Sequence, residues 1–197
     1  PFLLMAKIAT GLIPKITYDN CEQLLTSEFG GANSLSLRRL RSALLQSRTE
    51  DDKRSSAEII ISCITTGDIP IEDSRELLRV HTLFATAQKA ARAKNATIHD
   101  VLGAIWSNAV NADGEKISDV WQNAALKGGL RGAAADRDLD AMIQLFDSAA
   151  RHMDRFPHST PKRFLEDLSH QEIVSDVISY QGQRPDVVEI LTVHNTK

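Results

Sequence analysis

The chain has 197 residues, of which 42% are hydrophobic and 25% are charged, and its net charge at pH 7 is −3. This length allows one sizeable domain with a buried core. The slight acidity argues against a protein that coats nucleic acid over its whole surface, although a local basic patch can still bind it. No apolar run approaches the roughly 20 residues that cross a bilayer, and the first residues lack the charged leader of a signal peptide. We therefore expect a cytoplasmic protein without membrane contact.

The cysteines and histidines give no pattern of a cross-linked or metal-binding protein. Cys21 and Cys63 both lie in helix-like sequence, so they are expected to be reduced thiols and not part of a disulfide framework. The histidines show no paired spacing typical of a metal site. Because no nucleophile and base stand in a recognisable arrangement either, we expect no metal and no catalytic residue in this chain.

Helical periodicity dominates the chain from its start to about residue 170. It predicts helices over residues 3–10, 18–28, 35–46, 56–65, 73–94, 98–106, 117–126 and 137–156, and a last helix with Pro161 in its first turn. Leu45 is expected on the buried face of helix 35–46, and Leu78 on that of helix 73–94.

Polar residues and glycines mark the predicted helix ends and loops. Asn33 or Ser34 can cap the helix that follows the pair Gly30-Gly31, and Thr97 with Asp100 has the spacing of a capping box. Residues 47–54 are expected to form a charged loop, residues 127–135 a loop of small residues, and residues 171–183 a connector.

The end of the chain has a different pattern. An almost unbroken β-branched and aliphatic run predicts a strand buried on both faces of a parallel sheet; its members are Val187, Val188, Ile190, Leu191 and Val193. A buried strand needs neighbours, and no second parallel strand is apparent. The predicted fold class is therefore all-α, an irregular multi-helix domain with one C-terminal β-strand, cut from a larger protein.

This strand and its tail, VEILTVHNTK, resemble the start of motif V in superfamily 1 DNA helicases of the UvrD, Rep and PcrA kind. In that motif a strand leads to a hydroxyl residue, a spacer, a histidine, two small or polar residues, and then Lys-Gly-Leu-Glu. Thr192, His194 and Lys197 stand in register with it. The segment TPKRFLEDLSHQEI, residues 160–173, is similar to the stretch that precedes motif V.

Two further segments resemble the inserted helicase subdomain called 2B. They are LLTSEFGGANSLSLRRLRSAL, residues 24–44, with its glycine turn before a helix, and RDLDAMIQLFDSAARHMDRF, residues 137–156. Taken together, the chain looks most like the actinobacterial helicase–nuclease subunits of the AdnA and AdnB type.

The resemblance implies a division of the chain into three parts. Residues 1–15 would be a tether helix from motor subdomain 2A, residues 16–184 the accessory subdomain 2B, and residues 185–197 a strand of 2A with the start of motif V. The chain has no G-x-x-x-x-G-K-[ST] sequence to hold a nucleotide triphosphate. The resemblance thus implies a parent ATP-dependent DNA helicase of repair or recombination that uses ATP and magnesium and moves 3′ to 5′, whereas this piece has no cofactor of its own.

The candidate site residues are expected to contact DNA at two places. At the glycine turn, backbone amides before a helix N-terminus would bind a phosphate of duplex DNA, and the following arginines would add contacts that position the duplex without reading its sequence. These residues are Gly30, Gly31, Ser34, Arg38, Arg39 and Arg41. The resemblance implies that Thr192, His194 and Lys197 contact the single strand on which the motor moves.

Other interpretations of the same residues stay open. The glycine turn can be an ordinary tight turn beside a solvated basic face, and residues 127–132 are more typical of a flexible connector than of a phosphate loop. Trp106 and Trp121 fit core packing better than base stacking. The domain as a whole can dock a second subunit of a helicase–nuclease complex instead of DNA, or belong to an unrelated all-α protein with a ligand-binding helical body.

Overall fold

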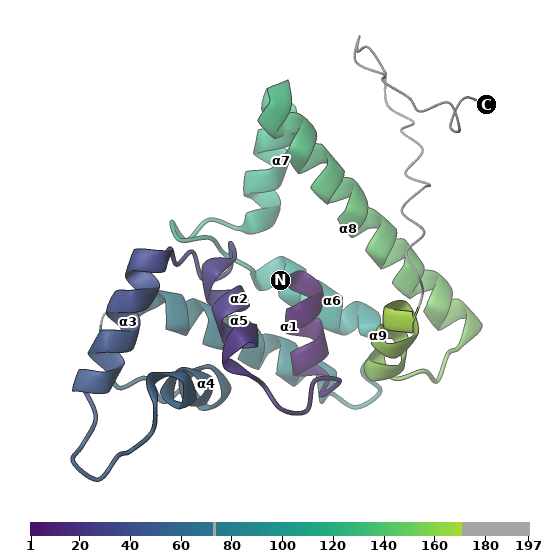
Figure 1. The fold of residues 1–197 in the computed structure, drawn as a ribbon. Helices are drawn as coiled ribbons and strands as arrows, with labels where there is room; N and C mark the ends of the chain where they lie inside the picture. The colour runs from purple at the N-terminus through teal and green to yellow at the C-terminus, as the bar shows by residue number, and fades with distance from the viewer. Residues whose placement is uncertain (73, 171–197) are drawn as a thin grey trace, which may run out of the picture.

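The computed structural model describes residues 1–72 and 74–170, which fold into helices joined by short loops (Figure 1). In chain order these are α1 (Phe2–Ala9), α2 (Tyr18–Thr26), α3 (Ser34–Gln46), α4 (Ser56–Thr66), α5 (Arg75–Ala91), α6 (Ile98–Asn108), α7 (Ile117–Lys127), α8 (Gly129–Arg155) and α9 (Pro161–His170). Within this part of the chain the only β-type pairing is an isolated antiparallel bridge between Val110 and Lys116. The predicted helical class is confirmed here.

The predicted C-terminal strand lies outside the described residues. The same holds for the connector at residues 171–183 and for the predicted single-strand contacts Thr192, His194 and Lys197. Their roles stay predictions. Among the described helices, none has both the length and the apolar character needed to cross a membrane.

Helix α5 forms the centre of the body and packs against α1, α2, α4 and α6. Its apolar residues recur at helical spacing, and Leu77 and Val80 are completely buried. Met5 of α1 is also completely buried, and α1 packs on α5 and α6. Residues 1–15 therefore share the core of the helical body, and their origin in a motor subdomain stays a prediction.

The helix starts follow the sequence closely because their capping residues are local. Thr97 Oγ1 accepts a hydrogen bond from the Asp100 amide at 3.2 Å, and the Asp100 carboxylate accepts one from the Thr97 amide at 2.9 Å. This confirms the predicted capping box of α6. Ser55 and Glu58 form the same arrangement at α4. Every predicted helix end lies within three residues of the observed one except the start of α8.

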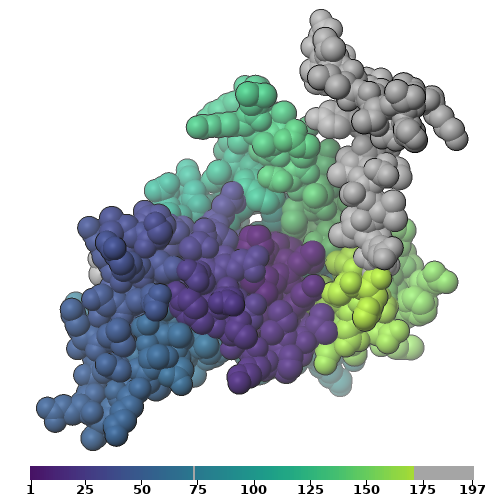
Figure 2. Space-filling model, in the orientation of Figure 1, coloured from purple at the N-terminus to yellow at the C-terminus, as the bar shows by residue number. Residues whose placement is uncertain are grey.

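The predicted loop at residues 127–135 is wrong. Helix α7 continues to Lys127, and α8 begins at Gly129, so α7 and α8 form a helical hairpin. Gly128 and Gly129, with φ values of +68° and +73°, confine the reversal to two residues. The stretch that follows consists mainly of leucine, arginine and alanine, which favour a helix, and Gly132 alone does not interrupt it. Figure 2 shows this hairpin as a projection from the body.

Two leucines expected on buried faces are exposed. Leu45 of α3 keeps 39% of its surface accessible and Leu78 of α5 keeps 56%. Both come directly after a buried leucine, and a helix turns by about 100° per residue. Because α3 packs mainly on α2 and α4, the covered stripe is too narrow to include Leu45.

Candidate nucleic-acid interface

The glycine turn between α2 and α3 uses its own backbone amides. The amides of Gly30 and Gly31 both donate to the Ser27 carbonyl, at 3.2 and 2.7 Å, and the Ala32 amide donates to the Leu25 carbonyl at 2.8 Å. The expectation of free amides that could bind a phosphate here is therefore wrong. These donors complete the turn at the end of α2.

Close packing explains the two glycines. Gly30 is buried, and a Cβ atom built on it would lie 2.2 Å from the Leu25 carbonyl oxygen. Gly31 has a φ of +66°, and a Cβ atom there would lie 3.0 Å from the Cβ of Ala112. The two glycines are thus required by the close packing of the turn. Their contact with DNA stays a prediction, and no free amide supports it.

Asn33 caps the N-terminus of α3. Its side-chain oxygen accepts hydrogen bonds from the amides of Leu35 and Ser36 at 3.0 and 2.8 Å, while the Ser36 hydroxyl accepts from the Asn33 amide at 2.9 Å. Of the two predicted caps, Asn33 is therefore the one used. Ser34 is the exposed first residue of the helix.

The three predicted arginines of α3 differ in their surroundings. Arg38 and Arg39 are exposed, and neither forms an ion pair with another described residue. Arg41 instead donates from Nε to the Ser56 hydroxyl at 3.2 Å and lies over the Tyr18 ring, 5.3 Å from its centroid. All three arginines are exposed, but these contacts tie Arg41 to α2 and α4, whereas Arg38 and Arg39 form no such contact with another described residue.

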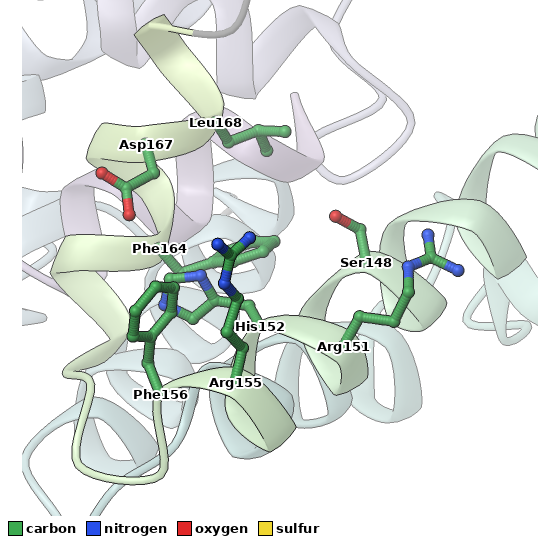
Figure 3. Close-up of a pocket in the computed structure, with 8 residues that line it drawn as sticks. All are labelled: Ser148, Arg151, His152, Arg155, Phe156, Phe164, Asp167 and Leu168. Carbon is green, nitrogen blue, oxygen red and sulfur yellow. The ribbon is translucent and has the colours of Figure 1, made fainter.

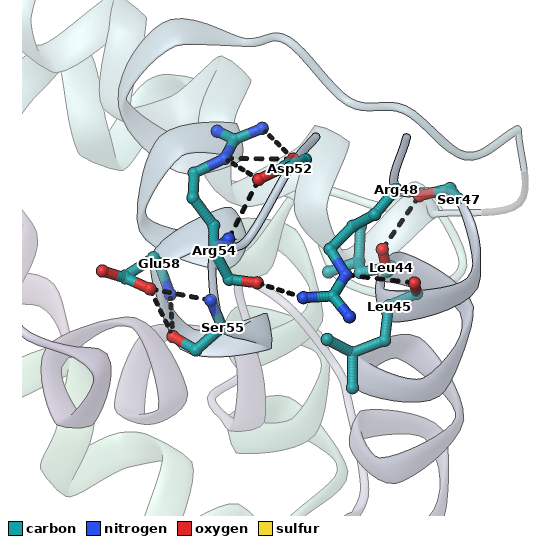
Figure 4. Close-up of polar contacts among 8 residues, drawn as sticks. All are labelled: Leu44, Leu45, Ser47, Arg48, Asp52, Arg54, Ser55 and Glu58. Atoms are coloured by element: carbon teal, nitrogen blue, oxygen red, sulfur yellow. Dashed lines mark hydrogen bonds and ion pairs between the residues drawn. The ribbon is translucent and has the colours of Figure 1, made fainter. Parts of the chain in front are cut away.

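The charged loop that follows α3 is held together by its own side chains (Figure 4). Arg48 donates to the Arg54 carbonyl at 2.7 Å, and Arg54 pairs with Asp52 at 2.7 Å. Hydrogen bonds from Arg54 lower the pKa of Asp52 to about 2. Residues 34–55 carry six basic and three acidic side chains, so this region is positive in a chain whose net charge is −3.

A groove of about 660 Å³ separates α3 from the start of α5, beside the glycine turn. Arg39 of α3 lines it together with Arg75 and Arg79 of α5, and Glu76 is its acidic residue. The Arg79 guanidinium donates to the carbonyls of Phe29 and Gly30, 50 and 49 residues away in sequence. Arg75 and Arg79 were not among the predicted site residues, because nothing local in the sequence places them beside α3.

The two tryptophans pack on each other and on the body. Their rings meet edge to face with centroids 5.7 Å apart, and Trp106 also contacts Phe2 at 6.4 Å. The Trp121 indole donates to the Glu28 carboxylate at 2.8 Å. Both side chains are half-buried in these contacts, which agrees with packing and not with bases stacking on free ring faces.

Cys21 and Cys63 are free thiols buried in the core. Burial raises the pKa of Cys21 to about 12 and that of Cys63 to about 11, so both stay protonated at neutral pH. In the described part of the chain, no group of three or more histidine, cysteine or acidic side chains is placed to hold a metal ion.

A second cleft, of about 390 Å³, lies where α8 meets α9 (Figure 3). His152 is placed between the rings of Phe156 and Phe164, each 5.2 Å away between centroids, and its Nε2 is 2.8 Å from the Ser159 hydroxyl. Arg155 lies over the Phe156 ring, 5.4 Å from its centroid. These contacts fix the turn between the two helices, and no described residue hydrogen-bonds Nδ1 of His152 as an orienting group would in a catalytic pair.

No model of a known protein family matches the chain, and no curated protein matches it. The helicase resemblance therefore depends on the motif residues and on the helical body described above.

Proposed function

We propose that this chain is the helical accessory domain of a superfamily 1 DNA helicase and that it contacts the phosphate backbone of duplex DNA. The observation that carries the proposal is the basic face of α3. Arg38 and Arg39 are exposed there, in a region with an excess of positive charge within an acidic chain. Such a face attracts phosphates without reading base sequence.

The proposal assigns the contact to arginine side chains and not to the amides of Gly30 and Gly31, since those amides are already hydrogen-bonded. The parent motor would supply ATP and magnesium, and this domain would hold the duplex ahead of it. The motif resemblance of Thr192, His194 and Lys197 supports the link to the motor. A parent gene that continues with Gly-Leu-Glu after Lys197 would strengthen this link, and any other continuation would remove it.

The DNA contact is tested by measuring the affinity of the 197-residue chain for a short duplex by fluorescence anisotropy across a series of salt concentrations. Arg38→Glu with Arg39→Glu should abolish most of the binding and reduce the slope of log affinity against log salt by about 2, one per lost phosphate contact. Arg92→Glu, at the other end of α5, is the matched control and should change little. Equal affinity of the α3 variant and the control would refute the DNA contact.

A second candidate function, docking of a partner subunit, is favoured by the tip of the α7–α8 hairpin. Leu126 and Leu130 are 85% and 94% exposed there, and Lys127 and Arg131 flank them. Exposed leucines beside cations suit an apolar patch with an acidic rim on another subunit of a helicase–nuclease complex. Co-purification with that subunit, lost in Leu126→Ser with Leu130→Ser, would support this function; a complex that is unchanged in the variant would count against it.

A further inference from the structure

We infer that the groove between α3 and α5 is a binding site for a phosphate group, with Arg39, Arg75 and Arg79 as its ligands. The inference deepens the proposed DNA contact and rests on it for the origin of the phosphate, although the site itself is argued from the groove. The three arginines come from two helices that are far apart in sequence, and the fold brings them to one cavity.

The position of two of these arginines follows from helix geometry. Arg75 is the first residue of α5 and Arg79 lies four residues later, so both project from the same side of the helix. Arg39 reaches the groove from the facing side, on α3. A ligand in the groove would thus be contacted from two directions.

The charges in the groove favour an anion. None of the three guanidinium groups forms an ion pair with another described residue, and Glu76 is the one carboxylate among the described residues of the lining. Three like charges around one cavity repel one another, and an anion between them removes that repulsion. The lining is therefore better matched to a ligand with more than one negative charge than to a neutral one.

Arg79 is held in place before any ligand arrives. Nε and one terminal nitrogen donate to the carbonyls of Phe29 and Gly30, which fixes the plane of the guanidinium. A guanidinium has five N–H donors, so others stay available, and its fork matches two phosphate oxygens. A pre-positioned arginine loses less conformational entropy on binding than a freely rotating one.

The size of the groove leaves room for more than a phosphate ion. At about 660 Å³ it is larger than a phosphate ion needs, so it can accept a phosphate together with the sugar on either side. The ligand class is therefore a phosphate ester of a nucleotide or of a polynucleotide backbone. Free pyrophosphate presents phosphate oxygens with a higher negative charge and no sugar, and it serves as the simplest probe.

The test uses the 197-residue chain and three probes: inorganic pyrophosphate, a nucleoside 5′-monophosphate and a short DNA duplex, each titrated by isothermal calorimetry and by amide NMR shifts. All three should bind, and amide shifts should centre on residues 75–79 and 36–40. Arg39→Gln with Arg75→Gln should weaken each by at least about tenfold, because each lost charge-assisted hydrogen bond is worth about 1.5–3 kcal/mol and 1.4 kcal/mol is a factor of ten. Arg92→Gln, the matched control, should stay within about twofold.

Both arginines in the double variant are exposed, so that variant should keep the wild-type melting temperature. Arg79→Gln is the second variant, and it is compared with the wild type in both binding and melting temperature. Weaker binding at an unchanged melting temperature would assign the loss to the phosphate contact, because the glycine turn would then be intact. If the small probes bind at the groove and no duplex binds, the phosphate site stands and the proposed DNA function fails. If duplex binding depends on Arg38 but neither small probe binds, or if the double variant binds like the control, the groove is not a phosphate site.

Discussion

The imidazole ring of His81 on α5 lies directly over the α-carbon of Gly67, the residue that ends α4. A Cβ atom built on Gly67 would lie 2.4 Å from Nε2 of that ring, and the Nδ1 atom is 2.9 Å from the Ile64 carbonyl oxygen. One histidine thus closes the end of α4 and leaves room for no side chain at residue 67. The contact joins two helices of the core.

Replacing Gly67 with alanine should therefore destabilise the protein for two reasons. Its φ of +79° is unfavourable for any residue with a Cβ atom, at about 1–2 kcal/mol, and the clash with His81 adds about 1–3 kcal/mol. Gly114→Ala is the matched control, since Gly114 has a φ of +81° and nothing within 4 Å of its Cβ position. Urea denaturation should show the larger loss for Gly67→Ala, and equal losses would contradict the packing argument.

Acid should weaken the cap of α6. Hydrogen bonds from Thr97 hold the pKa of Asp100 below its ordinary value of 3.8. Because the carboxylate is favoured in the folded state, its contribution is complete above the unfolded pKa and is lost as the pH falls from there through the folded pKa. Asp100→Asn keeps a side-chain acceptor but does not titrate, so its loss of stability between pH 6 and pH 2.5 should be smaller than that of the wild type.

Thr97→Ala measures how much that cap contributes to the stability of the protein at neutral pH. The variant should lose about 1 kcal/mol of unfolding free energy, the usual value for a Thr cap. Denaturation curves of Asp100→Asn and Thr97→Ala that keep the full wild-type pH dependence would show that Asp100 is not the titrating group.

The buried thiols should resist modification in the folded protein. Burial raises the pKa values of Cys21 and Cys63 to about 12 and about 11, so the reactive thiolate is scarce at pH 8. An aromatic disulfide reagent should label neither residue under native conditions and both in denaturant. Rapid native labelling that the Cys63→Ser variant abolishes would place the reaction at Cys63 and contradict its burial in the folded protein.

Tyr18 should tolerate the loss of its hydroxyl group. That hydroxyl is buried and has no hydrogen-bond partner among the described residues, whereas its ring lies beneath the Arg41 guanidinium. Tyr18→Phe should therefore leave the stability unchanged or raise it by up to about 1 kcal/mol. Tyr18→Ala removes the ring as well and should cost more; a marked loss in Tyr18→Phe would show that the hydroxyl has a partner.

The helices were predictable because their signals are local. Thr97 and Asp100 are three residues apart, and the buried residues of α5 repeat at the spacing of one helix face. The prediction failed at residues 127–135, where a cluster of glycines outweighed the alanines that continue α8. It also failed at Leu45 and Leu78, because the width of a buried face depends on how many neighbours pack on it.

The candidate interface was predicted only in part. The sequence by itself determined the helical class, the caps and the basic face of α3, since propensity, capping and charge act over a few residues. Only the tertiary structure showed that the amides of Gly30 and Gly31 are occupied, that Arg41 is held by Ser56, and that Arg75 and Arg79 face Arg39 across a groove. The contacts of Arg41 and Arg79 join residues separated by 15 to 50 positions, and their geometry depends on how whole helices pack. The amides of Gly30 and Gly31 bond within their own turn, whose conformation had to be seen.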